Sequence, residues 1–155
     1  MMIGGSRSLS VLLVSGLLCS AAGIARAAGE NGAPAPQSQQ VLEQCPKRPN
    51  CICTEYPEDR KHYAEPIRLS ETLDPLGRAA AVITAMGGQV QTIDGDRLVA
   101  TFTSRLFRFV DDFTLRVDSS ARLLHIRSAS RVGYGDFGVN RRRVERFRSG
   151  FSEDE

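Results

Sequence analysis

Residues 89–130 read QVQTIDGDRLVATFTSRLFRFVDDFTLRVDSSARLLHIRSAS, and this stretch decides the fold. Its short runs between turn signals predict four strands, over residues 89–93, 97–103, 112–118 and 122–130, and the third run alternates apolar and polar residues. Turn signals separate these runs, with Asp94-Gly95-Asp96 after the first strand and Ser119-Ser120 after the third. Short strands that are joined by tight turns pair as an antiparallel meander.

A helix is expected on each side of this stretch. Ser70 or Thr72 begins the first, Gly87-Gly88 ends it, and its apolar residues recur at helical spacing: Leu73, Leu76, Ala80, Ile83 and Met86. The second helix spans residues 140–151, with a narrow apolar stripe of Val144, Phe147 and Phe151. The order predicts an α+β domain: a four-stranded antiparallel meander with an N-terminal and a C-terminal helix packed on the sheet.

The first 27 residues have the pattern of a cleavable signal peptide. Arg7 lies before an apolar run, and Ala25-Arg26-Ala27 places small residues at a peptidase site before Ala28. The apolar run covers about a dozen residues, whereas a membrane span needs about 20. Leu18 directly before Cys19 fits a lipoprotein signal poorly, although lipidation at Cys19 stays open. We therefore expect a periplasmic or secreted protein after cleavage near Ala27/Ala28.

The rest of the chain divides into three parts. Residues 28–44 are expected to form a disordered linker, residues 45–151 a single α+β domain, and residues 152–155 an acidic tail. Cleavage would remove Arg7 and Arg26 and no acidic residue, so 18 basic and 18 acidic residues would remain. This balance gives no support for nucleic-acid binding. Arginine dominates the remaining bases, which favours carboxylate or phosphate partners, although codon bias would give the same composition.

Three cysteines lie close together in the segment CPKRPNCIC, at positions 45, 51 and 53. Outside the cytoplasm such thiols oxidise, and we expect a disulfide between Cys45 and Cys51. Cys53 is then left over, to remain free, pair with another chain or exchange with the bridge. A metal site of the three thiols and His62 is an alternative, but the spacing matches no standard pattern. We expect no metal and no cofactor.

Residues 133–138 read GYGDFG, which is formally the dinucleotide-binding pattern G-x-G-x-x-G. That function also needs a parallel βαβ unit and an acidic residue about 20 positions further on. Too little chain follows Gly138 for either. We therefore interpret this segment as a glycine-rich turn.

Polar residues gather over positions 104–142 and form the candidate ligand-binding site. They are Ser104, Asp111, Asp112, Arg127, Ser128, Ser130, Arg131, Asp136, Asn140 and Arg141. Strand alternation places Ser128 and Ser130 on the face of Leu124 and Ile126, where Asp112 or Asn140 could be their partners. Two interpretations stay open. The cluster is either an Asp–Arg network that pins the loop and last helix to the sheet, or a pocket in which arginines bind an anion.

Evidence for catalysis is weak. Ser104, His125 and Asp111 have the residue types of a catalytic triad, but no nucleophile elbow accompanies them. The arginine-rich segment at 141–146 has the character of a membrane-surface or nucleic-acid element. Acidic residues follow it and export disfavours nucleic acid, so we expect most of its charges to form a solvated face.

Three segments carry a family resemblance: CPKRPNC at 45–51, SRLFRFVDD at 104–112 and RSASRVGYGDFGVNRRRV at 127–144. Together they resemble the family called domain of unknown function 1499. The resemblance implies a small, mostly bacterial protein, commonly exported or membrane-associated, with no established activity or ligand. The family usually has Val-Ser where this chain has Ile52-Cys53, and a serine where it has Gly135.

The leading expectation is a non-enzymatic envelope protein that binds an anionic ligand or partner through the region of Arg127, Arg131 and Arg141. One alternative is a hydrolase or transferase using Asp111, Asp112 or Asp136. Another is a thiol or metal module around Cys53. We expect no nucleic-acid partner and a monomer in solution, and leave the partner unknown, with an envelope or membrane-surface partner open.

Overall fold

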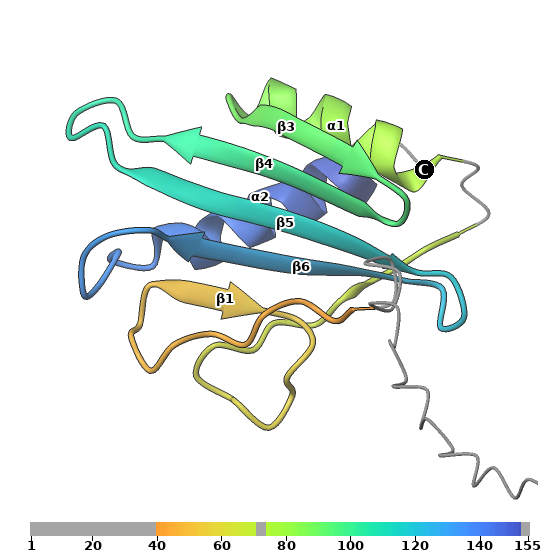
Figure 1. The fold of residues 1–155 in the computed structure, drawn as a ribbon, viewed down its shortest axis with the longest axis horizontal. Helices are drawn as coiled ribbons and strands as arrows, with labels where there is room; N and C mark the ends of the chain where they lie inside the picture. Colours follow the sequence, from red (N-terminus) through yellow and green to blue (C-terminus); the bar gives the residue numbers. More distant parts are fainter. Residues whose placement is uncertain (1–39, 71–73, 153–155) are drawn as a thin grey trace, which may run out of the picture. The chain divides into compact units, whose positions relative to one another are not determined.

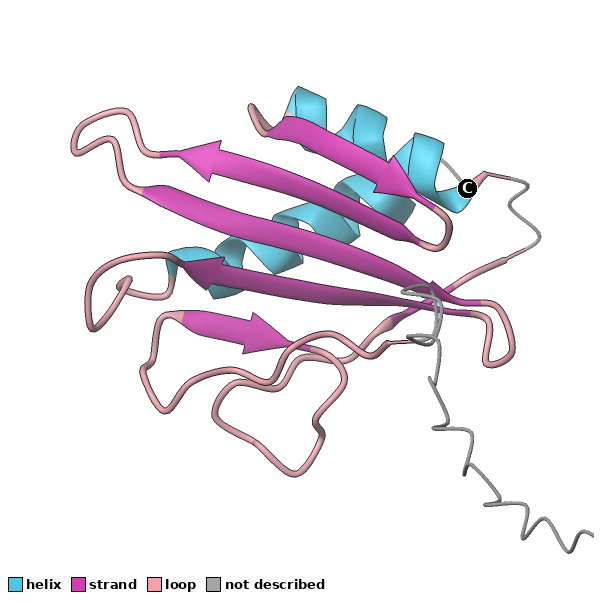
Figure 2. Ribbon diagram, viewed as in Figure 1, coloured by secondary structure: helices cyan, strands magenta, loops and turns pink. Residues whose placement is uncertain are grey.

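The computed structural model describes residues 40–70 and 74–152. Within these residues the chain forms eight elements, in the order β1 (Cys51–Cys53), β2 (Ile67–Arg68), α1 (Pro75–Ala85), β3 (Gln89–Asp94), β4 (Arg97–Thr103), β5 (Val110–Asp118), β6 (Leu123–Ser130) and α2 (Val139–Ser152). The strands form one sheet with the order β1-β6-β5-β4-β3, and β2 also pairs with β6 (Figures 1 and 2).

The α+β class and the antiparallel meander β3-β4-β5-β6 are confirmed, but the count of four strands is wrong. The sheet has six strands within the described residues, because β1 and β2 add antiparallel to the free edge of β6. Cys51 pairs with Ala129, and Ile67 pairs with Leu124. These strands have three and two residues, too few for an alternation that a sequence pattern could reveal.

Helix α1 begins at Pro75, which is later than Ser70. The Asp74 side chain accepts a hydrogen bond from the Gly77 amide at 2.8 Å, and Pro75 occupies the first helical turn. Both are start signals, because an N-cap oxygen satisfies a free amide and proline has no amide to satisfy. Thr72 and Leu73 lie outside the described residues. Gly87 follows the helix with φ of +85°, as expected for a glycine at a helix C-terminus.

Both helices pack on the same face of the sheet, which we call the inner face (Figure 1). The core lies between them and consists mainly of alternate strand residues and the apolar sides of the helices. Its fully buried large side chains include Phe113, Leu115, Leu124, Ile126, Ile83, Val144, Phe147 and Phe151. The predicted stripe of α2 is therefore confirmed, and this burial fixes α2 across the centre of the sheet.

The opposite, outer face is crossed by residues 40–44, which the sequence placed in a linker. Leu42 is only 1 % exposed, and its carbonyl accepts a 2.7 Å hydrogen bond from the Tyr56 hydroxyl. Arg97 on β4 donates to the Gln40 carbonyl, and Arg127 on β6 donates to the Glu43 carbonyl at 2.9 Å. This part of the segment therefore contacts the folded domain, because the Leu42 side chain is buried there and three backbone carbonyls accept hydrogen bonds from it.

The expected signal peptide, Cys19 and residues 28–39 of the expected linker lie outside the described residues. In the part that is described, no helix is long and apolar enough to cross a membrane.

Candidate functional site

Five of the predicted site residues meet in one place, between the inner face of the sheet and the start of α2. They form, together with two further residues, what we call the polar network: Asn50, Asp111, Ser128, Ser130, Asp136, Asn140 and Arg143. The network brings together β5, β6, the loop before α2 and the chain just before β1. It lies at the end of the domain where β4, β6 and the start of α2 meet their loops (Figure 1).

Asn140 is the centre of this network and is fully buried. Its Oδ1 accepts a 2.6 Å hydrogen bond from the Ser128 hydroxyl. Its Nδ2 lies within 2.9 Å of three acceptors: the Asn50 carbonyl, the Ser130 hydroxyl and the Asp136 carboxylate. The two serines thus face the core as expected, and of their two expected partners, Asp112 and Asn140, the structure gives Asn140. A buried amide with all its bonds made fixes the position of α2 relative to the sheet.

An ion pair between Asp111 and Arg143 closes the network on the side of β5. Arg143 Nη2 lies 2.7 Å from Asp111 Oδ2, and the two side chains are only 10–11 % exposed. Arg143 Nη1 also donates to Asn140 Oδ1 at 2.6 Å, and the guanidinium lies 4.7 Å from the centroid of the Phe102 ring. Several partners share this guanidinium, so its charge is compensated in the interior.

Asp136 organises the start of α2. Its Oδ1 accepts from the Gly138 amide at 2.9 Å, and its Oδ2 accepts from the Asn140 amide at 2.7 Å. A carboxylate in this position satisfies free amides and complements the helix dipole. Gly133 and Gly138 both have positive φ, as do residues in tight turns. The interpretation of residues 133–138 as a glycine-rich turn is therefore confirmed.

The other five predicted residues lie apart from the network. Arg131 forms a bidentate pair with Asp112, at 2.8 to 3.1 Å, and these hydrogen bonds raise the pKa of Arg131. Arg127 pairs with Glu43 at 3.2 Å. Arg141 donates to the carbonyls of Lys61 and Tyr63, far away along the chain, and Ser104 Oγ accepts from the nearby Phe109 amide. Arg127, Arg131 and Arg141 thus contact three different partners and do not converge.

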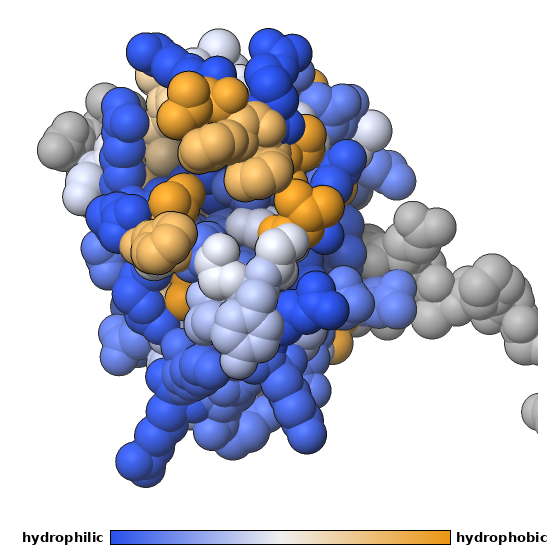
Figure 3. Space-filling model, turned by 90° about the vertical axis from the view of Figure 1, so that its left-hand side faces the viewer, coloured by the Kyte–Doolittle hydropathy of each residue, from blue (hydrophilic) through white to orange (hydrophobic). Residues whose placement is uncertain are grey.

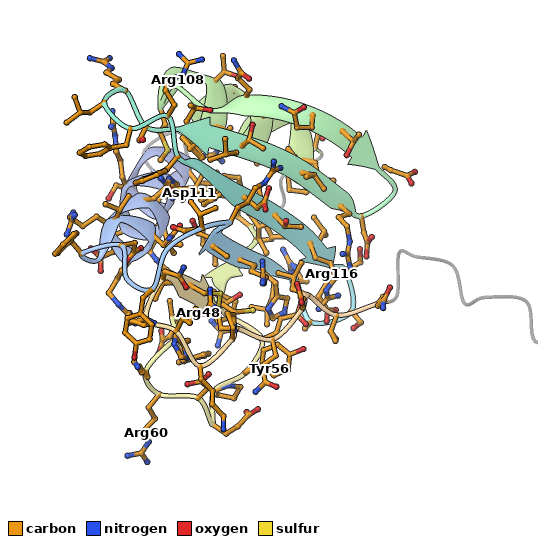
Figure 4. All side chains as sticks on the ribbon, turned by 60° about the vertical axis from the view of Figure 1, so that its left-hand side comes forward. Arg48, Tyr56, Arg60, Arg108, Asp111 and Arg116 are labelled. Carbon is orange, nitrogen blue, oxygen red and sulfur yellow. A yellow bond between two sulfur atoms is a disulfide. The ribbon has the colours of Figure 1, made fainter. Side chains whose placement is uncertain are left out.

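The triad of Ser104, His125 and Asp111 is wrong. Asp111 shares the inner face with Phe113, whereas His125 pairs in register with Arg116 on the outer face. The sheet therefore separates the two side chains. His125 is buried beside Thr54, with 3.3 Å between Nδ1 and Oγ1, and burial lowers the pKa of this imidazole. Figure 4 labels Asp111 near the start of β5 and Arg116 towards its other end, with Tyr56 on the outer side.

Cys45 and Cys51 form the expected disulfide, with an S–S distance of 2.04 Å. Cys53 is a free cysteine that is 2 % exposed, and burial raises the pKa of its thiol. A raised pKa and restricted access both oppose thiolate chemistry. His62 contacts Asp59 and the Arg48 carbonyl, at 2.7 and 2.9 Å. Among the described residues, no group of three or more His, Cys, Asp or Glu residues could hold a metal ion.

A second feature lies beside the polar network, on the surface of the same end. The β4–β5 loop, residues 104–109, and the β6–α2 loop, residues 131–138, both project there (Figure 1). We call these two loops, together with Val139, the loop end. It exposes seven large apolar or aromatic side chains: Leu106, Phe107, Phe109, Val132, Tyr134, Phe137 and Val139. Figure 3 shows orange groups on this end with hydrophilic side chains around them.

A hollow of about 270 Å³ adjoins the loop end. It is lined by Met86, Phe102, Val139, Arg142, Arg143 and Arg146. Arg142 and Arg146 are four residues apart on α2, so their side chains lie on the same side of the helix. Arg142 donates to the Phe137 carbonyl at 2.9 Å. The Arg146 side chain has no hydrogen bond or ion pair with any described residue, so this hollow has a basic rim.

The sequence did not predict Asn50, Arg143 or the loop end as parts of a site. Arg143 could have been found, because it lies three residues after Asn140 and therefore on the same side of the helix. Asn50 could have been found from the pairing of β1 with β6, had that strand been predicted. The loop end carries no such signal, since an apolar residue in a loop is equally consistent with burial in the core.

Comparison with known proteins gives one result. The model of a family described as "Protein of unknown function (DUF1499)" matches residues 41–151, which is most of the chain and all of the sheet. A comparison with curated proteins found no match.

Proposed function

The chain belongs to the DUF1499 family, and on that premise we propose that its domain is a non-enzymatic module that binds an anionic partner at the loop end. The observation that carries this proposal is the composition of that surface. Exposed apolar side chains on two loops lie beside the arginine-rimmed hollow of α2. Apolar area and cationic groups side by side suit a partner that is both anionic and amphiphilic.

The contacts of the motif carboxylates support a binding role over a catalytic one. Asp111 pairs with Arg143, Asp112 pairs with Arg131, and Asp136 accepts from two amides. A general acid or base must have access to a substrate proton, and these carboxylates are engaged elsewhere. We therefore place the motif residues in a scaffold role, which holds the two loops and the start of α2 in position.

The charge of the loop end favours an anionic partner. Arg105, Arg108 and Arg146 have no side-chain partner among the described residues, and Arg142 contacts one carbonyl. Of the neighbouring carboxylates, those of Asp111 and Asp112 are in ion pairs and that of Asp136 accepts hydrogen bonds from amides, which leaves Glu145 on the same helix. Figure 4 shows Arg108 at this end, above the buried Asp111. Export to the envelope, which the order of the first 27 residues supports, would bring this surface to anionic lipids, glycans or proteins.

Retention on phosphocellulose tests the proposal. The mature chain is expected to be nearly neutral, so its retention would report a local basic surface. Arg142→Gln with Arg146→Gln should elute at clearly lower salt than the wild type. The matched control is Arg68→Gln with Arg122→Gln, which removes the same charge near the opposite end of β5 and β6. Equal elution of the wild type and the first variant, or an equal loss in both variants, would reject the arginine rim beside the loop end as the basic surface.

A further inference from the structure

We infer that the anionic partner is a phospholipid bilayer, into whose interface the apolar tips of the loop end insert. This inference rests on the proposed function and names its partner. Phe107 and Phe137 supply the inserted rings, and Arg105, Arg108, Arg142 and Arg146 contact lipid phosphates.

The exposure of the loop tips is the first observation. Phe137 is 98 % exposed, Leu106 80 %, and Tyr134 74 %. The Phe107 and Phe109 rings are stacked at 5.6 Å between centroids, so they contact each other in addition to the body of the domain. Exposed single apolar residues are ordinary, but a group this large on two adjacent loops marks an interaction surface.

The backbone of Phe137 is the second observation. Its φ is +51°, in the left-handed region that favours glycine. This backbone conformation therefore destabilises the folded state, and the exposed ring adds no stabilisation through burial. Arg108 in the other loop has φ of +56°. Arg122 in the β5–β6 turn has φ of +54°, so what distinguishes Phe137 is that its strained backbone carries a ring that is 98 % exposed.

The shape of the surface selects a bilayer over a protein. The apolar residues stand on protruding loop tips, and the most exposed ring has almost no contact with the domain. A protein partner would need pockets to receive them, whereas a bilayer interface accepts aromatic side chains without preformed complementarity. A second copy of this surface would bring like charges together, since arginines surround the tips. Anionic headgroups instead match these charges.

Vesicle co-sedimentation is the first test. The probes are vesicles of phosphatidylcholine alone and vesicles with added phosphatidylglycerol. Wild-type protein should sediment with the anionic vesicles and much less with the neutral ones. Phe107→Ser with Phe137→Ser should weaken this binding by tenfold or more, since each inserted ring contributes apolar burial. Ile93→Ser with Val41→Ser is the matched control, because both side chains are about half exposed elsewhere, and should bind as wild type.

The second test measures how deeply the β6–α2 loop inserts into the bilayer. The chain has no tryptophan, so Phe137→Trp introduces the only indole. Its emission should shift to the blue on addition of anionic vesicles and should be quenched by brominated lipids. Ile93→Trp on the edge strand is the control and should show neither effect.

The outcomes separate this inference from the proposed function. Retention on phosphocellulose with no binding to anionic vesicles overturns membrane docking alone. Vesicle binding with an unquenched Phe137→Trp indole also overturns insertion, since the contact is then electrostatic only. A blue shift that depends on protein concentration without vesicles shows self-association and rejects the bilayer as occupant. Loss of retention and of vesicle binding together rejects the proposed function as well.

Discussion

Arg143 Nη2 lies 2.7 Å from Asp111 Oδ2 beneath the sheet, and this pair ties α2 to β5 at the end where both loops emerge. The same guanidinium donates to Asn140, whose amide binds the chain before β1 and the carboxylate of Asp136. One connected set of hydrogen bonds thus fixes four segments of the domain. This arrangement assigns the family motifs of the chain a scaffold role under the loop end.

Asp111→Asn should destabilise the domain by about 3 kcal/mol. The variant leaves the Arg143 charge without its carboxylate at a position that is nine-tenths buried, and an unpaired buried charge is costly. Urea unfolding followed by circular dichroism measures the difference in the free energy of unfolding.

Asp112→Asn is the matched control for this substitution. It makes the same chemical change one residue further along β5, but its partner Arg131 is more than half exposed. Solvent compensates an exposed ion pair, so its effect should be much smaller. Equal destabilisation by the two variants would contradict the scaffold role of the buried pair.

Phe137→Gly should leave the domain as stable as wild type, or stabilise it by up to about 1 kcal/mol. Glycine removes the cost of a positive φ, and its own flexibility in the unfolded chain offsets part of that gain. Thermal unfolding measures the change, and vesicle binding by the same variant should fall. A loss of stability comparable to that of a core substitution would show that the ring packs on the domain.

His125 should make the domain less stable as the pH falls below about 6.5. Burial lowers the pKa of this imidazole, and the charge of Arg116 lowers it further, against the opposing effects of Glu55, Asp118 and a hydrogen bond with Thr54. The unfolded chain then binds the proton more readily than the folded one, so stability is complete above the unfolded pKa and is lost as the pH falls towards the folded pKa. Each unit of pKa lowering corresponds to about 1.4 kcal/mol.

The free energy of unfolding at pH 8 and pH 5 tests this linkage in wild type and His125→Gln. The wild type should lose more stability between the two pH values than the variant does. An equal loss in both proteins would assign the pH dependence to other groups.

Cys53 should not react with a thiol reagent in the native protein. Its side chain is buried and its pKa is raised, which leaves little accessible thiolate. When the protein is unfolded in urea without reductant, the wild type should react with one more equivalent of the reagent than Cys53→Ala does. Rapid reaction of native wild-type protein, absent in Cys53→Ala, would instead support a thiol-active module.

The regular part of this fold could be predicted because its periodicity is undisturbed. Residues 97–103 follow the turn signal at Asp94-Gly95-Asp96 and form β4 with the predicted bounds, and α2 extends one residue beyond each predicted end. Strand alternation alone placed Ser128 on the core face, and Asn140, its partner in the structure, was one of the two candidates together with Asp112. Pattern and structure agree wherever one face of an element is buried over its whole length.

The parts that could not be predicted depend on contacts between distant segments. The third strand was expected from residue 112, so the side chain of Asp111 had no assigned face. In the structure β5 begins at Val110, and Asp111 therefore points to the inner face, away from His125. Residues 40–44 are held on the outer face by hydrogen bonds from Arg97 and Arg127, which lie more than 50 residues away along the chain. Composition alone carries no information on such partners.

A map of amide chemical shifts on titration with bicelles that contain phosphatidylglycerol tests the central claim most directly. We predict that the largest changes fall on residues 105–109 and 132–139, with smaller changes at Arg142 and Arg146 beside the hollow. The amides of Asn140 and Asp111, which belong to the scaffold, should keep their slow exchange with solvent. Changes centred on the outer face around Arg116 and Tyr56, with the loop end unaffected, would contradict the account.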